Sequence, residues 1–396
     1  MKTRKTYLTP ILALSLLLTA CGASDTGSVT EPADEVQAPA QTTAEAAPET
    51  DAESATEAET AAPAEEAPVI GEPEKTKLEV GHLNSTAHLL AFVAKEEGLF
   101  ADEGLDVTLT QLANGTELAS GLESGKLDAA LIGSVPSITM QAAGHDLTIF
   151  GGAMTNGHGY VIKSEFTEGL DEWDHTILKG KNVAVAQNTM DDLELRLLLR
   201  EEGIGIGEGE DEVNLVYFDS QSNAYAALSN DEIDACSVYS PYASLAKSQG
   251  YEVVYYDVQY EQFENQPCCR QVTTGEQLAA SPNTYVAFER AMIRAYQFTQ
   301  TDHDRTIEDV AKYIDIDPEL IEVEVYGGFS SSNPDPDKQA TVRLKGDVVD
   351  LGLIEDYDIE PHYNTDIYQT ALTQVIAQFP EESVYQDLQK HFDEFE

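Results

Sequence analysis

Strand-type and helix-type hydrophobic patterns alternate along the chain from about residue 78 onward. Leu78 to His82 predicts a strand, and the apolar positions of residues 90–94 then recur at helical spacing. Two more strands are predicted at residues 105–112 and 128–132, with a helix at residues 116–124 between them. This regular alternation is typical of an α/β fold with a largely parallel sheet.

The same pattern returns about 105 residues later in the chain. The run GKLDAALIGSVP at residues 125–136 is echoed by DEIDACSVYSP at residues 231–241, and EEGL at 96–99 is echoed by EEGI at 201–204. Generic βαβ units share their period and turn chemistry, so chance similarity is one interpretation. The interpretation that we favour is two lobes of like architecture.

The first 21 residues predict an export signal. Three basic residues precede an apolar run at residues 7–19, which is shorter than the roughly 20 residues that span a bilayer. The run ends in LTACG, which resembles the lipobox of bacterial lipoproteins, in which the cysteine, here Cys21, is acylated. An ordinary signal peptide with a chance cysteine is the alternative. Acylation of Cys21 would make the mature protein extracytoplasmic and lipid-anchored to the cell membrane.

Residues 22–76 predict a disordered tether. The segment consists mainly of Ala, Glu, Thr, Pro and Ser, and carries 14 acidic residues against one lysine. Such a composition cannot bury enough apolar surface to offset the entropy of ordering, and its like charges extend the chain. Cation binding by the acidic run is the alternative to a spacer.

The charge of the whole chain excludes nucleic acid as the main partner. The 396 residues include 72 Asp and Glu against 22 Lys and Arg, which gives a net charge of −50, and residues 77–396 alone carry −40. Phosphate binding needs clustered Lys and Arg side chains. The hydrophobic content of 42% is sufficient for a core, and the length fits two lobes of roughly 100 to 200 residues each.

Several motifs, in order and spacing, resemble the solute-binding proteins of ABC importers. They are KEEGLF at 95–100, EGLDV at 103–107, SGKLDAA at 124–130, GSVP at 133–136 and KGKNVAV at 179–185. The branch that they resemble is the nitrate, sulfonate, taurine and thiamine-pyrimidine-precursor group. The resemblance covers about residues 78–310.

The resemblance implies a type II periplasmic-binding-protein fold, in which two α/β lobes joined by two crossover strands close on a small ligand. The expected first lobe comprises residues 77–164 and 272–396, and the expected second lobe residues 165–271. The expected partners are a small molecule, a membrane permease with its ATPase, and the membrane itself through the lipid on Cys21. We expect a monomer that needs no cofactor.

The candidate ligand-binding residues lie in four turns that follow predicted strands. In open α/β sheets, small molecules bind beyond the carboxyl ends of the strands, where helix N-termini present free N–H groups. Ordinary helix capping is the alternative at each position. The candidates are Asn84, Ser85, Thr86 and His88, then Ser134 and Val135, then Asn188 and Thr189, and finally Tyr239 and Tyr242.

Three further candidates lie where the chain is expected to cross between the lobes. His158 and Tyr160 alternate with glycines, which allow a hinge or a close approach of the backbone to a ligand. His158 could equally be a structural histidine. Arg270 could pair with a carboxylate, sulfonate or phosphate, or form a salt bridge with one of the many acids.

The adjacent cysteines Cys268 and Cys269 depart from the family pattern. In an exported chain they could form a vicinal disulfide, pair with Cys236, remain thiols or ligate a soft metal. Cys236 falls in a predicted buried strand, where a lone cysteine is usually a small core residue. With Cys21 set aside, three cysteines remain, so at least one stays unpaired or engages another molecule.

The sequence carries no catalytic signature of the common kinds. No HExxH, GxSxG, Walker-type loop or paired CxxC motif occurs. We therefore expect a binding protein and not an enzyme. A surface enzyme related to pyrimidine-precursor synthases, and a lipoprotein that captures metal or haem, are the alternatives. The sequence does not decide between two classes of ligand. One is an anion held by helix dipoles and Arg270, and the other is a neutral or cationic heterocycle stacked on tyrosine.

Overall fold

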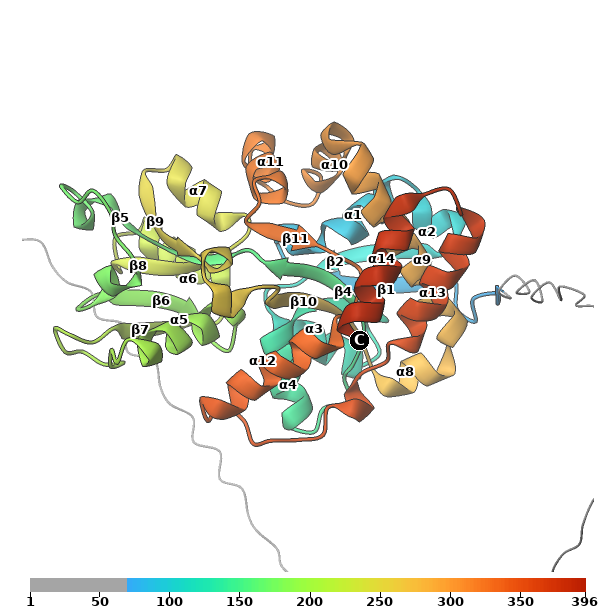
Figure 1. Ribbon diagram of the computed structural model, residues 1–396, viewed down its shortest axis with the longest axis horizontal. Coiled ribbons are helices and arrows are strands. Elements are labelled where there is room, and N and C mark those ends of the chain that lie inside the picture. The colour runs from blue at the N-terminus through green and yellow to red at the C-terminus, as the bar shows by residue number, and fades with distance from the viewer. Residues whose placement is uncertain (1–69) are drawn as a thin grey trace, which may run out of the picture. The chain divides into compact units, whose positions relative to one another are not determined.

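Residues 70–396 of the computed structural model form two β-sheets flanked by helices (Figure 1). The first sheet has the spatial order β11 (Ser330–Ser332), β4 (Thr148–Asn156), β10 (Pro267–Thr273), β3 (Ala129–Gly133), β1 (Lys77–His82), β2 (Asp106–Gln111). The second has the order β7 (Asn214–Phe218), β6 (Asn182–Ala186), β8 (Ala235–Tyr239), β5 (His158–Lys163), β9 (Tyr251–Tyr256). We call the parts of the chain built on these sheets the first and second lobes.

The two sheets repeat one arrangement of strands. In the first, β1 lies parallel to both β2 and β3, and in the second, β6 lies parallel to both β7 and β8. An antiparallel strand follows in each, β10 beside β3 and β5 beside β8. Because β3 and β8 contain the repeated sequence runs, the expectation of two lobes of like architecture is confirmed. Each sheet is mixed and not purely parallel, because one of its strands arrives from the other lobe.

Helices cover both faces of each sheet (Figure 1). The helices of the first lobe are α1 (Leu89–Glu96), α2 (Leu99–Asp102), α3 (Gly115–Glu123), α4 (Ser134–Ala142), α8 (Gly275–Ala280), α9 (Pro282–Thr301), α10 (His303–Val310), α11 (Pro318–Tyr326), α12 (Lys338–Asp350), α13 (Asp366–Gln378) and α14 (Ser383–Phe395). Those of the second lobe are α5 (Met190–Glu201), α6 (Gln221–Ser229) and α7 (Tyr242–Ser248). Short 3₁₀ turns are η1 (Thr86–His88), η2 (Ser164–Phe166), η3 (His175–Leu178), η4 (Asp257–Gln259), η5 (Glu261–Phe263) and η6 (Glu360–His362).

The alternation of side chains along the strands divides each lobe into two apolar layers. Leu131 joins a cluster with Phe92 of α1 and Phe288 of α9, whereas its neighbour Ile132 packs with Leu118 of α3 on the opposite face. Successive residues of a strand point to opposite faces, so a strand covered on both sides is apolar throughout. The continuous hydrophobic run of β3 has this origin.

The chain crosses between the lobes at Asn156–Gly157 and returns just before Pro267. β5 belongs entirely to the second sheet and β10 entirely to the first. These positions differ from the expected boundaries at residues 164 and 271, because the sequence does not reveal which sheet a buried strand joins. Both residues of the first crossing have left-handed backbones, with φ of 57° at Asn156 and 91° at Gly157. The φ of Gly157 is one that L side chains rarely adopt, so a substitution there would strain the backbone.

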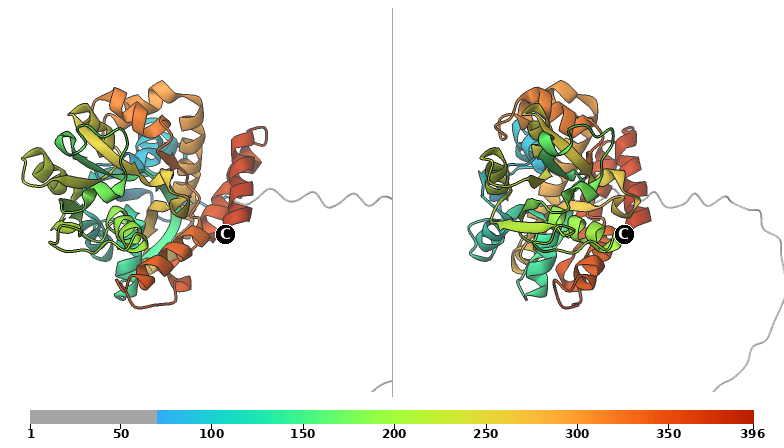
Figure 2. Two further views of the ribbon diagram at one scale, coloured as in Figure 1. Left: turned by 60° about the vertical axis from the view of Figure 1, so that its left-hand side comes forward. Right: turned by 90° about the vertical axis from the view of Figure 1, so that its left-hand side faces the viewer.

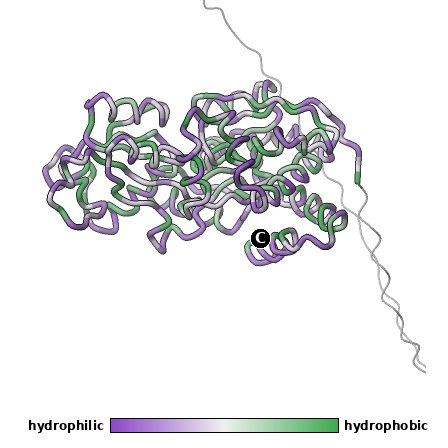
Figure 3. The backbone as a smooth tube through the Cα atoms, turned by 90° about the horizontal axis from the view of Figure 1, so that it is seen from above, coloured by the Kyte–Doolittle hydropathy of each residue, from purple (hydrophilic) through white to green (hydrophobic). Residues whose placement is uncertain are grey.

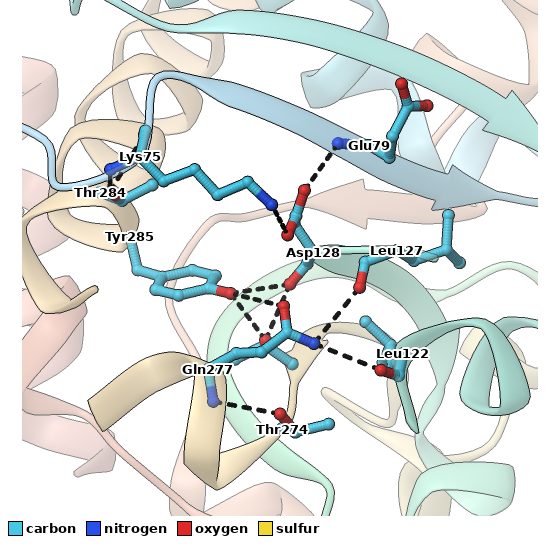
Figure 4. A network of polar contacts seen from close by, with 10 residues as sticks. Lys75, Glu79, Leu122, Leu127, Asp128, Thr274, Gln277, Thr284 and Tyr285 are labelled. Atoms are coloured by element: carbon cyan, nitrogen blue, oxygen red, sulfur yellow. Dashed lines mark hydrogen bonds and ion pairs between the residues drawn. The ribbon is translucent and has the colours of Figure 1, made fainter. Parts of the chain in front are cut away.

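The residues just before β1 are part of the folded structure (Figure 4). The Glu74 carboxylate accepts hydrogen bonds from the backbone N–H groups of Asn283 and Thr284, at 3.3 and 3.0 Å, in the first turn of α9. The Lys75 ammonium binds the Asp128 carboxylate. The tether predicted to extend to residue 76 therefore differs from the structure at its last residues. The remaining tether and the signal segment lie mostly outside the described residues.

The C-terminal helices pack on the first lobe, as predicted. α13 lies along α9, and α14 lies against α13 (Figure 2). α14 buries Tyr385, Leu388 and Phe392 on one face, and the alternation of hydrophobic and hydrophilic positions is visible in Figure 3. The segment after α11 begins with β11, which pairs with β4. Within residues 70–396, no helix is long and apolar enough to cross a membrane.

Candidate functional site

A cavity of about 530 Å³ lies at the carboxyl ends of the parallel strands of both sheets. Its wall is formed by the turns after β1, β2 and β3 of the first lobe, the turns after β6, β7 and β8 of the second, and residues of the crossing strands. The volume falls in the range of roughly 300 to 1,000 Å³ that is typical of small-molecule sites. This is also the edge at which open α/β sheets bind ligands.

The first lobe contributes three turns to the wall. Ser85 follows β1, Asn114 and Glu117 follow β2, and Gly133 ends β3. The Asn114 side chain caps α3 by accepting a hydrogen bond from the Glu117 backbone N–H at 2.9 Å. Glu117 therefore sits in the first turn of that helix, where its carboxylate faces the partial positive charge of the helix N-terminus.

The second lobe contributes the three corresponding turns. Asn188 and Thr189 follow β6, Ser220 follows β7, and Tyr239 ends β8. The Ser220 hydroxyl accepts a hydrogen bond from the Asn223 backbone N–H at 3.3 Å and so caps α6. The wall thus draws on helix N-termini from both lobes, as the sequence predicted.

Beside the cavity the two lobes are hydrogen-bonded to each other. The Ser85 hydroxyl donates to the Ser240 carbonyl at 3.0 Å, and the Thr86 and Ser240 hydroxyls are also hydrogen-bonded. The Asn84 side-chain amide donates to the Tyr242 hydroxyl at 3.3 Å. The turn after β1 therefore contacts the turn after β8. A cavity between two lobes that also hydrogen-bond to each other can enclose a ligand when the lobes move toward each other.

His158 enters the wall from the first crossing and is held by two buried acids. Its Nδ1 lies 3.3 Å from the Asp257 Oδ2 and 3.7 Å from the Glu194 Oε1. Burial alone would lower the pKa of His158, but the hydrogen bond to Asp257, together with the charges of Asp257 and Asp191, raises it overall. Burial, with the charges of Asp257 and Asp191, raises the pKa of Glu194 well above its usual value. The surroundings therefore favour the protonated form of both the His158 ring and the Glu194 side chain.

Cys268 and Cys269 both belong to the wall because β10 bulges at this point. Pro267 pairs with Thr155 and Cys269 with Met154, which leaves Cys268 as the extra residue. Their sulfurs lie 3.3 Å apart, and all three cysteines of residues 70–396 are free thiols. The structure therefore brings two free thiols to the cavity wall.

The contact between the two thiols shifts their pKa values in opposite directions. The hydrogen bond with Cys268 lowers the pKa of the Cys269 thiol against the effect of burial, and His88 and His158 lower it further. The same hydrogen bond raises the pKa of Cys268. Cys269 is therefore the more acidic and the more nucleophilic thiol of the pair. Cys236, in contrast, is buried in the core of the second lobe, as predicted.

Five of the thirteen predicted ligand residues lie in the wall, namely Ser85, His158, Asn188, Thr189 and Tyr239. The wall also includes Cys268 and Cys269, which the sequence offered only as candidate metal ligands. Four others lie next to the interlobe contacts or behind the wall, namely Asn84, Thr86, His88 and Tyr242. The rest are buried elsewhere, namely Ser134, Val135, Tyr160 and Arg270.

The buried candidates have structural partners. The Tyr160 hydroxyl donates to the Asp191 carbonyl at 3.1 Å, on the core side of β5. Val135 packs with Met190 and Leu193 in an apolar cluster that joins the two lobes. The Arg270 guanidinium donates to the carbonyls of Met154 and Cys269, at 3.4 and 3.0 Å. Arg270 is not part of the cavity wall, so the expected pairing with an anionic ligand has no support from its position.

The sequence analysis overlooked the turns after β2 and β7. Asn114 and Glu117 follow β2, and Asp219, Ser220 and Gln221 follow β7. The rule that selected the other turns applies equally to these, because β2 and β7 are parallel to their neighbours. Asp191 was also missed. No local pattern distinguishes it among 72 acidic residues, since its distinction is the burial of its carboxylate in the wall.

Comparison with known proteins now identifies the family. The family model described as NMT1-like matches residues 71–315. The chain belongs to the NMT1-like family. The match covers most of the first lobe and all of the second, including every strand that borders the cavity.

Sequence relatives are named as binding proteins. The chain is 28% identical over 273 residues to YtlA of Bacillus subtilis, whose name assigns it a binding role; the match covers 67% of this chain and 80% of YtlA. A second Bacillus subtilis protein, named for binding aliphatic sulfonates, is 31% identical over 173 residues, which are 43% of this chain and 49% of that protein. The resemblance to solute-binding proteins is confirmed, and these relatives are binding proteins by name and not enzymes.

Solved structures with the same fold include proteins that bind anions. The periplasmic nitrate-binding protein NrtA of Synechocystis matches with a TM-score of 0.67 at 16% identity, over 82% of this chain and all of that protein. The alkanesulfonate-binding protein SsuA of Xanthomonas axonopodis, solved with MOPS bound, matches with a TM-score of 0.61 at 18% identity, over 74% of this chain and 99% of that protein. The fold class predicted from the sequence is therefore confirmed as the periplasmic-binding-protein fold.

Proposed function

We propose that this protein is an extracytoplasmic solute receptor that captures a small molecule between its lobes and delivers it to an ABC-type importer. The observation that carries the proposal is the cavity, because six strand-end turns from two separate sheets contribute to one wall. No covalent chemistry is needed for this role. Ligand contacts with both lobes would favour the closed arrangement over an open one.

Anchoring by lipid is part of the proposal and rests on the sequence around Cys21. The apolar run before it and the acidic segment after it fit a secreted domain held at a membrane by acyl chains. Replacement of Cys21 by Ser should release the full chain into the medium. Mass spectrometry of the mature N-terminus should find acylated Cys21 in the unmodified protein. A protein that is cleaved elsewhere and carries no lipid would contradict this part alone.

The receptor role is tested with the protein as it leaves the cell. Native mass spectrometry of the protein purified without dialysis should show a co-purified small molecule that is released intact on unfolding. Cells that lack the protein should then take up that molecule more slowly, and the full chain should restore uptake. A molecule that returns chemically altered, or uptake that is unaffected, would contradict the receptor role.

A second candidate function, capture of a soft metal ion, is favoured by the thiols in the wall. Cys268 and Cys269 lie close to each other, and His88 and His158 both act on the Cys269 thiol. Thiolates and imidazoles are the ligands that soft and borderline metals prefer. A solved structure with the same fold, the ligand-binding component of an import system of Staphylococcus aureus, holds zinc. Elemental analysis of the purified protein decides between a metal and an organic cargo.

A further inference from the structure

The charges of the cavity wall point to a class of ligand different from those named for the structural neighbours. Among the described residues of the wall there is no lysine and no arginine, whereas Glu117, Asp191 and Asp219 are acidic. The one basic side chain is His158, and its Nδ1 already faces Asp257 and Glu194. An anion would therefore find no free cation on this wall.

Two of the four α-helices that begin at the wall, α3 and α5, carry acids in their first turns, whereas α4 and α6 carry none. A helix N-terminus attracts anions through its free N–H groups and its dipole. Here the first turn of α3 holds Glu117, and the first turn of α5 holds Asp191 and Asp192. At these two helix N-termini the wall residues Glu117 and Asp191 add negative charge, which opposes the binding of an anion there.

The carboxylate of Asp191 is the acidic group of the wall whose hydrogen bonding is least satisfied. Its side chain is 1% exposed, it belongs to the wall, and neither carboxylate oxygen has a hydrogen-bond donor among the described residues. A buried carboxylate without a partner is costly, and a ligand that donates N–H groups or carries a positive charge removes that cost. Asp192, the next residue, differs because Arg196 binds it at 2.9 Å.

The remaining wall favours an organic ligand over a bare metal ion. Tyr217, Phe218 and Tyr239 contribute aromatic surface, and the cavity volume of about 530 Å³ far exceeds that of an ion. Aromatic faces attract organic cations through their quadrupoles. The net charge of −40 on residues 77–396 also raises the local concentration of cations and repels anions.

We propose that the cavity binds an organic cation, an amine or a protonated nitrogen heterocycle, and that Asp191 is the carboxylate that pairs with it. This inference rests on the proposed receptor function and assigns its substrate class. It reverses the charge preference that the names of the nitrate-binding and alkanesulfonate-binding neighbours suggest.

The first test compares probes that differ in charge. Thermal shift and calorimetry of the full chain would use a broad metabolite library sorted by net charge, which includes putrescine, choline, nitrate, methanesulfonate and Zn²⁺. Choline has a matched control in 3,3-dimethylbutanol, which has the same shape without the charge. We expect the hits to concentrate among the organic cations, and every cationic hit to bind at least tenfold more tightly than its neutral isostere.

The second test changes one atom of the wall. Asp191→Asn should weaken binding of the best cation at least tenfold, while Asp192→Asn, which removes an adjacent acid outside the wall, should change it less than threefold. Unfolding of each variant without ligand controls for damage to the fold. Should Asp191→Asn fail to fold, the comparison of cation with neutral isostere on the unmodified chain still decides.

The outcomes separate the two proposals. Hits among anions or Zn²⁺ with no organic cation overturn the charge assignment and leave the receptor function standing. Cationic hits that Asp191→Asn does not affect overturn the role of Asp191. No hit from the whole library, with no molecule co-purifying from cells, overturns both the charge assignment and the receptor function.

Discussion

The Asn156 side-chain amide donates a hydrogen bond to the Asp257 carboxylate at 3.0 Å, which joins the chain's exit from the first lobe to its return. Asp257 also accepts from the backbone N–H groups of Gly157 and Val258, at 3.2 and 2.8 Å. The carboxylate is fully buried and contacts His158 as well. The Asn156 amide also donates to the Phe263 carbonyl at 2.7 Å, and its backbone N–H donates to the Gln266 carbonyl at 2.8 Å. Asn156 and Asp257 together therefore link the first crossing to the segment that leads into the second.

Asp257→Ala should destabilise the protein by about 3 to 5 kcal/mol, because it leaves several buried donors and the His158 ring without their acceptor. Urea unfolding monitored by circular dichroism measures the loss. Asp231→Asn is the matched control, since Asp231 is an exposed acid bound to Lys163, and it should change stability by less than about 1 kcal/mol. Equal urea midpoints for the two variants would refute this role of Asp257.

Glu194→Gln should stabilise the protein increasingly as pH rises. Because the pKa of Glu194 is raised above its usual value, mainly by burial, the proton it retains favours the folded state fully below about pH 4.5, and that advantage is lost as pH rises toward the folded pKa. Glutamine has the shape of the neutral acid and does not titrate. Melting temperatures of the two proteins should agree near pH 4.5 and diverge by pH 8, whereas exposed Glu232→Gln should show no such trend. A constant offset would be inconsistent with a neutral Glu194.

His82→Gln should remove a loss of stability that begins at mildly acidic pH. Burial lowers the pKa of His82 to about 4, because the ring packs against Phe92 and Tyr313, and nearby His88 lowers it further, although a hydrogen bond to the Leu83 carbonyl acts in the opposite direction. The unfolded chain takes up a proton near pH 6.5 and the folded chain only near pH 4, so stability falls between these values by about 3 kcal/mol at most.

The His82 prediction is checked by the difference in unfolding free energy between the unmodified chain and the variant from pH 7.5 to 4.5. His145→Gln, at a half-exposed histidine, is the control. A difference that does not depend on pH would mean that His82 titrates normally.

Removal of the segment before β1 should weaken the folded domain. A chain that begins at residue 77 lacks the Glu74 cap of α9 and the Lys75–Asp128 ion pair, whereas a chain that begins at residue 70 keeps both. Loss of a helix cap costs about 1 kcal/mol, so the shorter chain should melt several degrees lower. Glu74→Ala in the longer chain should reproduce most of the change. Identical melting curves for the two chains would mean that Glu74 does not stabilise the folded domain and belongs to the tether.

Cys269 should react with a small alkylating reagent before Cys268 and Cys236 do. Its thiol borders the cavity and its pKa is lowered by the hydrogen bond with Cys268, whereas burial raises the pKa of Cys236 in the core. Peptide mass spectrometry after brief treatment with iodoacetamide measures the order. Cys269→Ser should abolish the fast phase, and a cavity-filling ligand should slow it. Modification of Cys236 first would contradict the position of the thiols.

Periodicity was enough to predict most of the strands, because buried strands such as β3 and β8 are continuous apolar runs between glycine or acidic turns. It was also enough to find Ser85, Asn188 and Thr189, since the turn after a parallel strand always lies at the same edge of its sheet. His158 was found through the glycines beside it.

The remaining site depends on long-range packing that no local pattern encodes. Arg270 directly follows the wall residue Cys269, but its guanidinium binds backbone carbonyls instead of lining the cavity. Tyr160 lies two residues beyond His158 and packs in the core of the second lobe. The bulge that places Cys268 in the wall arises from pairing with a strand more than 100 residues earlier in the chain. Asp191 is distinguished only by its buried carboxylate, which has no hydrogen-bond donor among the described residues. This feature depends on the folded structure and has no trace in the local sequence.

The position of β10 between β3 and β4 has a consequence for the order in which the protein can assemble. Synthesis begins at the N-terminus, so β3 and β4 are complete long before residues 267–273 are made. Until then, the edges of β3 and β4 that will pair with β10 have no hydrogen-bonding partner. The second sheet, made from the continuous segment 182–256 together with β5, needs no later strand. Unpaired sheet edges invite pairing with other chains. The period before β10 arrives is therefore when a newly made chain depends most on chaperones that cover exposed strands.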